Sequence, residues 1–162
     1  MHIYIDILTK MCNYMHIMST KIDSLDEEII NLLMQDARHT SIALANELNV
    51  DSSTVRRRIR RLLDEKVMHF VALPEPERIG LSAEAVIALN IDHENIQSAL
   101  EVLRDSSKIR WAAVTSGRYD VIVYVWCYSI NDLYQFIETE IAKIEGLSSS
   151  ETFICMHVEK RP

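Results

Sequence analysis

The segment from Ser52 to Glu65 constrains the fold most, because apolar and basic residues recur in it at helical spacing. In a helix of about 100° per residue, its apolar side chains form a single stripe made of Val55, Ile59, Leu62 and Leu63. Such a stripe stabilises a short helix when it packs against other apolar elements. We therefore expect this helix to lie against neighbouring helices in a small domain.

The opposite face of this helix is basic. Arg58 lies on the margin of the apolar stripe, and the far side carries Ser53, Arg56, Arg57, Arg60 and Arg61. No acidic residue occurs between Ser52 and Leu63, whereas a face that is merely solvated usually mixes charges. The pattern is typical of a helix that contacts DNA phosphates and bases.

The arginines have different expected partners. Arg57 and Arg60 are candidates for base contacts, because arginine pairs bidentately with guanine, and Arg56 and Arg61 are candidates for phosphate contacts. Arg58, beside the apolar stripe, is expected to pair with an acidic residue of the first helix.

The start of the same helix carries hydroxyl groups. Ser52, Ser53 and Thr54 suit a phosphate or a base edge, since free backbone amides and hydroxyls meet at a helix N-terminus. Simple capping of the helix is an equal alternative.

Two helices are predicted before this segment. The first begins with Ser24 as its N-cap and ends near Arg38, and its helically spaced apolar residues are Leu25, Ile29, Leu32 and Leu33. The second runs from Ser41 to about Leu48.

A turn and a strand complete this half. Asn49 tolerates a left-handed conformation, and Asp51 or Ser52 can cap the third helix. Residues 67–72 are rich in β-forming side chains and predict a short strand. Helix, helix, turn, helix and strand in this order indicate a winged helix-turn-helix.

Prolines and a glycine between Leu73 and Gly80 mark a boundary. We predict an N-terminal extension at 1–22, a winged helix-turn-helix domain at 23–73, a linker at 74–82 and a second domain at 83–162. The extension lacks the pattern of a signal peptide or membrane anchor, and alternative starts at Met15 or Met18 leave open whether it is native.

The second domain alternates strands with helices. Strands are predicted at 85–91, 109–115, 121–127 and 151–158, and helices at 96–106 and 130–143. The order β-α-β-β-α-β is that of a ferredoxin-like fold, so the chain as a whole is α+β. A sheet of four strands leaves a surface and edges for a partner subunit to cover.

The composition restricts the function classes. The cysteines Cys12, Cys127 and Cys155 are far apart, and the histidines have no ligand spacing, so no metal site or cofactor is predicted. No apolar stretch is long enough for a membrane span, and we expect a cytoplasmic protein. The net charge of -7 opposes DNA binding, but the local arginine cluster allows one positive face on an acidic body.

Several blocks resemble the Lrp/AsnC family, the leucine-responsive or feast/famine regulators of bacteria and archaea. The blocks are LDEEIINLLMQDAR, IALANELNVDSSTVRRRIRRLLDEKVM, SGRYDVIVYV and SSSETFICMHVEK, and they span Leu25 to Lys160. The resemblance implies a regulator of transcription that binds double-stranded DNA and carries a regulation-of-amino-acid-metabolism (RAM) domain. It also implies homodimers assembled into tetramers or octamers, with an amino acid or similar effector bound between dimers.

The chain departs from the family at a few positions. Asn49 and Lys66 stand where the family usually has glycine, and Asp51 stands where it usually has serine. Ser150 takes a place often held by threonine.

The resemblance also implies an effector site around Gly117, Arg118, Tyr119 and Asp120, although such a sequence is by default an ordinary turn. Amides near Gly117 and Arg118 suit a carboxylate, Asp120 suits an ammonium group, and Ser150 or Thr152 can donate a hydroxyl. Arg118 has an alternative role in an ion pair between subunits.

Two other functions remain open. Siroheme decarboxylases resemble the same two-domain family, but they carry a segment rich in Phe and Pro where this chain has DARHTSIALA. We therefore expect no enzymatic activity. A DNA-bridging architectural protein without an effector is the third possibility.

Overall fold

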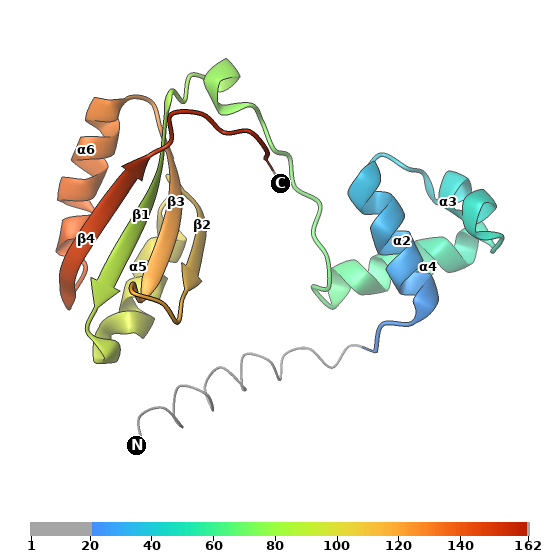
Figure 1. Cartoon of the computed structure of the whole chain (residues 1–162). Coiled ribbons are helices and arrows are strands. Elements are labelled where there is room, and N and C mark those ends of the chain that lie inside the picture. Colours follow the sequence, from blue (N-terminus) through green and yellow to red (C-terminus); the bar gives the residue numbers. More distant parts are fainter. Residues whose placement is uncertain (1–20, 162) are drawn as a thin grey trace. The chain divides into compact units, whose positions relative to one another are not determined.

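The computed structural model describes residues 21–161, which divide between Ala72 and Leu73 into two compact units (Figure 1). The extension expected at 1–22 lies almost wholly outside the described residues. None of the described helices is long and apolar enough to cross a membrane.

In its described part, residues 21–72, the first unit is a bundle of three helices: α2 (Ser24–Gln35), α3 (Ser41–Leu48) and α4 (Ser52–Asp64). Each contributes apolar residues to one core, which consists of Ile29, Leu33, Leu44, Ala45 and Val55. The predicted apolar stripe of α4 is confirmed, since Val55 and Leu62 are fully buried. The helix-turn-helix therefore rests on a small shared core.

Both ends of α2 differ from the prediction. Its N-cap is Asp23 rather than Ser24, because Asp23 and Asp26 each accept a hydrogen bond from the other's backbone amide in a reciprocal capping box. The helix ends at Gln35 rather than near Arg38, because Asp36 is extended and binds the backbone amide and guanidinium of Arg38.

The turn between α3 and α4 follows the expectation for Asn49. This residue is left-handed, with φ 53° and ψ 44°, and the amide of Val50 donates to the carbonyl of Ala45 at 3.0 Å. Asp51 occupies the N-cap position of α4, but its side chain makes no capping hydrogen bond. Asn49 thus sets the direction in which α4 leaves the turn.

The prediction of a strand at 67–72 is wrong. After α4 the chain turns through Lys66, which has φ 57°, and residues 67–72 contain no regular secondary structure. A strand needs a hydrogen-bonded partner, and none of the described strands pairs with this segment. Phe70 and Val71 are consequently exposed.

The second unit has a four-stranded antiparallel sheet in the order β2-β3-β1-β4. In chain order its elements are β1 (Ala83–Ile91), α5 (Ile96–Asp105), β2 (Ile109–Val114), β3 (Val121–Cys127), α6 (Ile130–Thr139) and β4 (Leu147–Ile154). Short 3-10 helices occur at Pro76–Ile79, His93–Asn95 and Ile141–Lys143. The ferredoxin-like order is confirmed.

Three boundaries in this unit were predicted wrongly. The α-helix α6 ends at Thr139 and a 3-10 helix follows, where one helix was expected to continue to Lys143. The strand β4 begins at Leu147 rather than Glu151, directly after Gly146, whose φ is 75°, and it ends at Ile154 rather than Val158. Serines 148–150 hide this start, because they lack the apolar alternation of a half-buried strand.

The two faces of the sheet are different. Residues of α5 and α6, such as Leu103 and Phe136, share a buried core with alternate residues of β1 and β3. The other face carries a row of side chains in register across all four strands, which we call the aromatic row: Trp111, Tyr124, Val86 and Phe153. Trp111 is 54% and Phe153 48% exposed, and Val86 and Tyr124 between them are half-buried, so this row is apolar and only partly covered.

Candidate nucleic-acid interface and effector site

Three arginines of α4 are free to meet a ligand. Arg56, Arg57 and Arg60 are exposed, and within residues 21–161 none of them forms an ion pair. They lie on the side of the helix opposite the buried Val55 and Leu62. The structure thus brings three positive charges together on one face.

The N-terminus of α4 adds hydrogen-bond donors beside these charges. Ser53 is exposed, and Ser52 and Thr54 are half-buried. The carbonyl of Asp51 accepts from the amides of Thr54 and Val55 at 2.9 and 3.1 Å. The amides of Ser52 and Ser53 precede these bonds and have no acceptor within the helix. Together with the partial positive charge of the helix end, they suit an anion.

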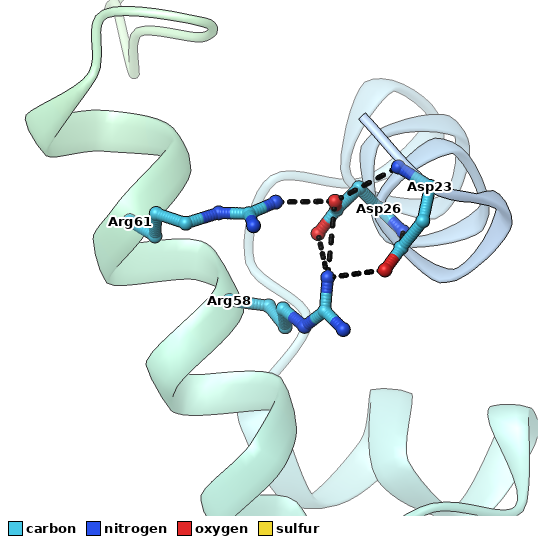
Figure 2. A network of polar contacts seen from close by, with 4 residues as sticks. All are labelled: Asp23, Asp26, Arg58 and Arg61. Carbon is cyan, nitrogen blue, oxygen red and sulfur yellow. Dashed lines mark hydrogen bonds and ion pairs between the residues drawn. The ribbon is translucent and has the colours of Figure 1, made fainter. Parts of the chain in front are cut away.

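The other two arginines of α4 point to α2 instead (Figure 2). Nη1 of Arg58 donates to Oδ2 of Asp23 at 2.6 Å and to both carboxylate oxygens of Asp26 at 3.2 Å. Arg61 donates from Nη2 to Oδ2 of Asp26. The expected pairing of Arg58 with the first helix is confirmed, whereas Arg61, expected near phosphates, lies on a carboxylate.

Asp26 is the centre of this network. It has no exposed surface, and Asp23 is held beside it by the capping box. The hydrogen bond from the Asp26 amide and the guanidinium of Arg58 lower the pKa of Asp23. Sequence reasoning missed Asp26, although an acid three residues after an Asp cap is the pattern of a capping box.

The turn predicted as an effector site joins β2 to β3 and is fixed by Asp120. Its Oδ2 accepts the amide of Ile91 at 3.0 Å, and its own amide donates to the carbonyl of Leu89 at 2.9 Å. The Asp120 carbonyl accepts the amide of Thr115 at 2.9 Å. One carboxylate oxygen of Asp120 therefore binds β1, which leaves the other for a ligand.

Tyr119 links this turn to β4. Its hydroxyl donates to the carboxylate of Glu151, and this bond raises the pKa of Tyr119. The guanidinium of Arg118 lies over the Tyr119 ring, 5.3 Å from its centroid. Glu151 was absent from the predicted site, because only the fold brings β4 close to this turn.

The remaining predicted residues are less closely grouped. Thr152 and Ser150 are in register with Ile87 and Leu89, whose side chains face the helix-covered core. Glu151 alternates with them and lies on the open face of the sheet. Tyr119 therefore meets Glu151 rather than either hydroxyl.

Gly117 has open space around it, since a Cβ there would meet nothing within 4 Å.

Among residues 21–161, no three His, Cys, Asp or Glu side chains gather into a group that could hold a metal ion.

Comparison with known proteins matches both units. The model described as "Winged helix-turn-helix DNA-binding" covers residues 22–67, and the "Lrp/AsnC ligand binding domain" covers residues 84–162. An uncharacterised HTH-type transcriptional regulator of Pyrococcus abyssi is 30% identical over 151 residues, which cover 93% of this chain and 96% of that relative.

Solved structures of similar fold point to the same family. AsnC of E. coli has a TM-score of 0.75 and 25% identity, and the match covers 88% of this chain and 97% of that one. A regulator from Neisseria meningitidis solved as a complex with L-Met shares the fold, with a TM-score of 0.76, 19% identity and coverages of 87% and 94%. The chain thus belongs to the Lrp/AsnC family of DNA-binding transcriptional regulators with a ligand-binding domain.

Proposed function

We propose that α4 reads the major groove of an operator through its exposed arginines. The observation that carries this proposal is the group of three exposed guanidiniums, on Arg56, Arg57 and Arg60, which form no ion pair within residues 21–161 and lie beside the open N-terminus of α4. Arg57 and Arg60 contact guanine edges, and Arg56 contacts a phosphate. Ser52, Ser53 and Thr54 bind a second phosphate or a base edge through their amides and hydroxyls.

A single α4 helix can contact only one half-site of an operator. The chain has a net charge of -7, so long-range attraction to DNA is weak and three cations give limited affinity. A homodimer that presents two α4 helices to half-sites about 34 Å apart overcomes this weakness. The aromatic row supports such pairing, because an exposed apolar row across all four strands is stabilised when a second sheet covers it. The assembly of such dimers into tetramers or octamers follows from the family resemblance.

The effector we propose is a free amino acid, bound at the β2–β3 turn between dimers. The amide of Gly117 and the guanidinium of Arg118 donate to its carboxylate, and the free oxygen of Asp120 accepts from its ammonium group. Tyr119 positions Arg118, whereas Ser150 and Thr152 lie on the helix-covered side of β4 and are not among the proposed contacts. The L-Met complex of the Neisseria meningitidis regulator supports the class of ligand, because it is an amino acid held by a protein of this fold. The regulator acts in the cytoplasm, where the chromosome is accessible.

DNA reading is tested by selecting binding sites from genomic fragments and comparing variants on the selected operator and on random DNA. Arg57→Ala is expected to lose about 1–3 kcal/mol on the operator and to relax one base position. Arg56→Ala is expected to weaken both DNAs alike. Arg104→Ala, which removes an exposed arginine from α5, is the control and leaves both affinities unchanged. Equal losses on both DNAs for Arg57→Ala would refute base reading.

Effector binding is tested by thermal shift with each free amino acid. The effector raises Tm of the wild type, does not raise Tm of Arg118→Ala, and alters the sites selected from the genome. If no amino acid does either, the protein is an effector-independent DNA-bridging protein. A porphyrin absorbance change on titration would instead support the decarboxylase alternative.

A further inference from the structure

A single buried carboxylate occupies two of the five arginines of α4. Arg58 and Arg61 both end on Asp26, whose side chain is 0% exposed, while their own side chains are 21% and 34% exposed (Figure 2). Arg58 also binds Asp23 at 2.6 Å. Two acids and two arginines therefore form a neutral group between α2 and α4, and we call it the Asp26 clamp.

The clamp divides α4 into three faces. The apolar face, with Val55 and Leu62, packs in the bundle, and the reading face carries Arg56, Arg57 and Arg60. Arg58 and Arg61 lie between them, three residues apart and so on neighbouring positions of one side. Two bonds at neighbouring positions fix the rotation of a helix about its axis, which apolar packing alone leaves freer.

The environment of Asp26 makes these bonds strong. Its carboxylate lies in the first turn of α2, where the helix dipole favours negative charge, and it accepts the amide of Asp23 at 3.2 Å. A buried carboxylate cannot exchange its partners for water, so it retains both guanidiniums. Nε of Arg61 is itself buried without a hydrogen-bond partner, which shows that its guanidinium is turned into the protein.

We infer that Asp26 is a positioning residue for DNA reading: it sets the rotation of α4 and withholds Arg58 and Arg61 from the phosphates. This inference rests on the proposed function, since it assumes that α4 is the reader. It predicts that Arg58 and Arg61 add nothing to the release of counterions from DNA.

The number of contacts is measured by the slope of log K against log salt concentration, for wild type and variants on operator and random duplexes. The affinity falls as salt rises, and each phosphate contact adds about 0.9 to the magnitude of this slope. We assign Arg56 to a phosphate, so Arg56→Gln is expected to reduce the magnitude of the slope by about that amount per subunit. Arg61→Gln is expected to leave the slope unchanged, because its charge is already paired.

Asp26→Asn releases Arg61 and leaves Arg58 paired with Asp23 alone. The magnitude of the slope is expected to rise, and the ratio of operator to random affinity to fall, because the freed guanidinium of Arg61 binds any phosphate and α4 loses its fixed rotation. Glu27→Gln is the matched control: it removes the same charge from the same turn of α2, but Glu27 is exposed and has no partner in the clamp. Far-ultraviolet circular dichroism reports whether each variant folds.

The outcomes separate the two proposals. If Arg61→Gln lowers the slope as much as Arg56→Gln, Arg61 contacts phosphate and the inference is overturned; this comparison decides even if Asp26→Asn fails to fold. A folded Asp26→Asn that behaves like Glu27→Gln also overturns it. If the wild type shows no salt-dependent DNA binding, the proposed function itself is refuted.

Discussion

Arg161 lies on Glu84, with its Nη2 atom 2.7 Å from Oε1 of a carboxylate that is 9% exposed. The hydroxyl of Tyr124 donates to the same carboxylate, and the guanidinium lies over the Trp126 ring, 5.8 Å from its centroid. Nε of Arg161 is also 3.5 Å from Oε2 of Glu75, which precedes the first 3-10 helix. The segment after β4 is therefore bound to the start of β1 and to the chain that leads into it.

Arg161→Gln is expected to lower the free energy of unfolding by about 1–3 kcal/mol at neutral pH, because Glu84 keeps its burial and loses its charged partner. Arg161 holds the pKa of Glu84 below its ordinary value of 4.5. A lowered pKa stabilises the folded state above pH 4.5, and this contribution is lost as the pH falls through the folded pKa.

Urea unfolding between pH 3 and pH 7 checks this expectation. The gap between wild type and Arg161→Gln is expected to narrow below about pH 4, while Arg104→Gln matches the wild type throughout. A gap that stays constant over this range would contradict the assigned role of Glu84.

Gly146 and Gly117 are expected to respond oppositely to alanine. Gly146 has φ 75°, and a Cβ there would lie 2.4 Å from Nδ2 of Asn95, so Gly146→Ala is expected to cost about 1–3 kcal/mol. Gly117 has open space around it, so Gly117→Ala is expected to leave stability unchanged. Thermal unfolding of both variants measures the difference, and similar Tm values for the two would show the strain at Gly146 to be absent.

Lys66→Gly is expected to stabilise the protein. Lys66 is left-handed, with φ 57°, which costs an ordinary residue about 1–2 kcal/mol and glycine almost nothing. After the entropy that glycine adds to the unfolded chain, a net gain of about 0.5 kcal/mol is expected. Glu65→Gly is the control: Glu65 has φ -83°, so glycine there only destabilises. Equal changes in Tm for both variants would contradict this account.

The aromatic row is expected to hold the dimer together. Trp111→Ser and Phe153→Ser are each expected to raise the dimer dissociation constant about tenfold or more, since large aromatic anchors dominate such interfaces. Tyr134→Ser serves as the control. Tyr134 is 57% exposed, but it lies on α6, which covers the face of the sheet opposite the aromatic row. Sedimentation velocity over a concentration series gives the constants. A wild type that stays monomeric would refute the dimer.

The sequence predicted well those elements whose own residues determine them. The run from Val121 to Cys127 is β3 at the expected residues, because a continuous apolar segment of this length has few alternatives in a sheet covered by helices. Asn49 is left-handed as expected, since its side chain tolerates that conformation and the turn requires it.

The features that were missed depend on tertiary neighbours. Arg61 projects from the basic side of α4, and only the packing of α2 against α4 shows that its guanidinium ends on Asp26. The strand expected at 67–72 has the right composition but no partner among the strands of residues 21–161. Glu151 joins the candidate effector site because β4 pairs with β1, which brings it within reach of Tyr119.

The two units have cores of very different size. Within residues 21–161, the buried cluster of the helix-turn-helix has five apolar residues, whereas that of the second unit has fifteen. A three-helix domain with so small a core is marginally stable by itself, and it is expected to open first when the protein is heated or meets a protease. An operator binds only the folded form and so acts as a folding ligand for this half. Protein molecules bound to an operator should therefore be degraded more slowly than unbound molecules. This would couple turnover of the regulator to its occupancy of the chromosome.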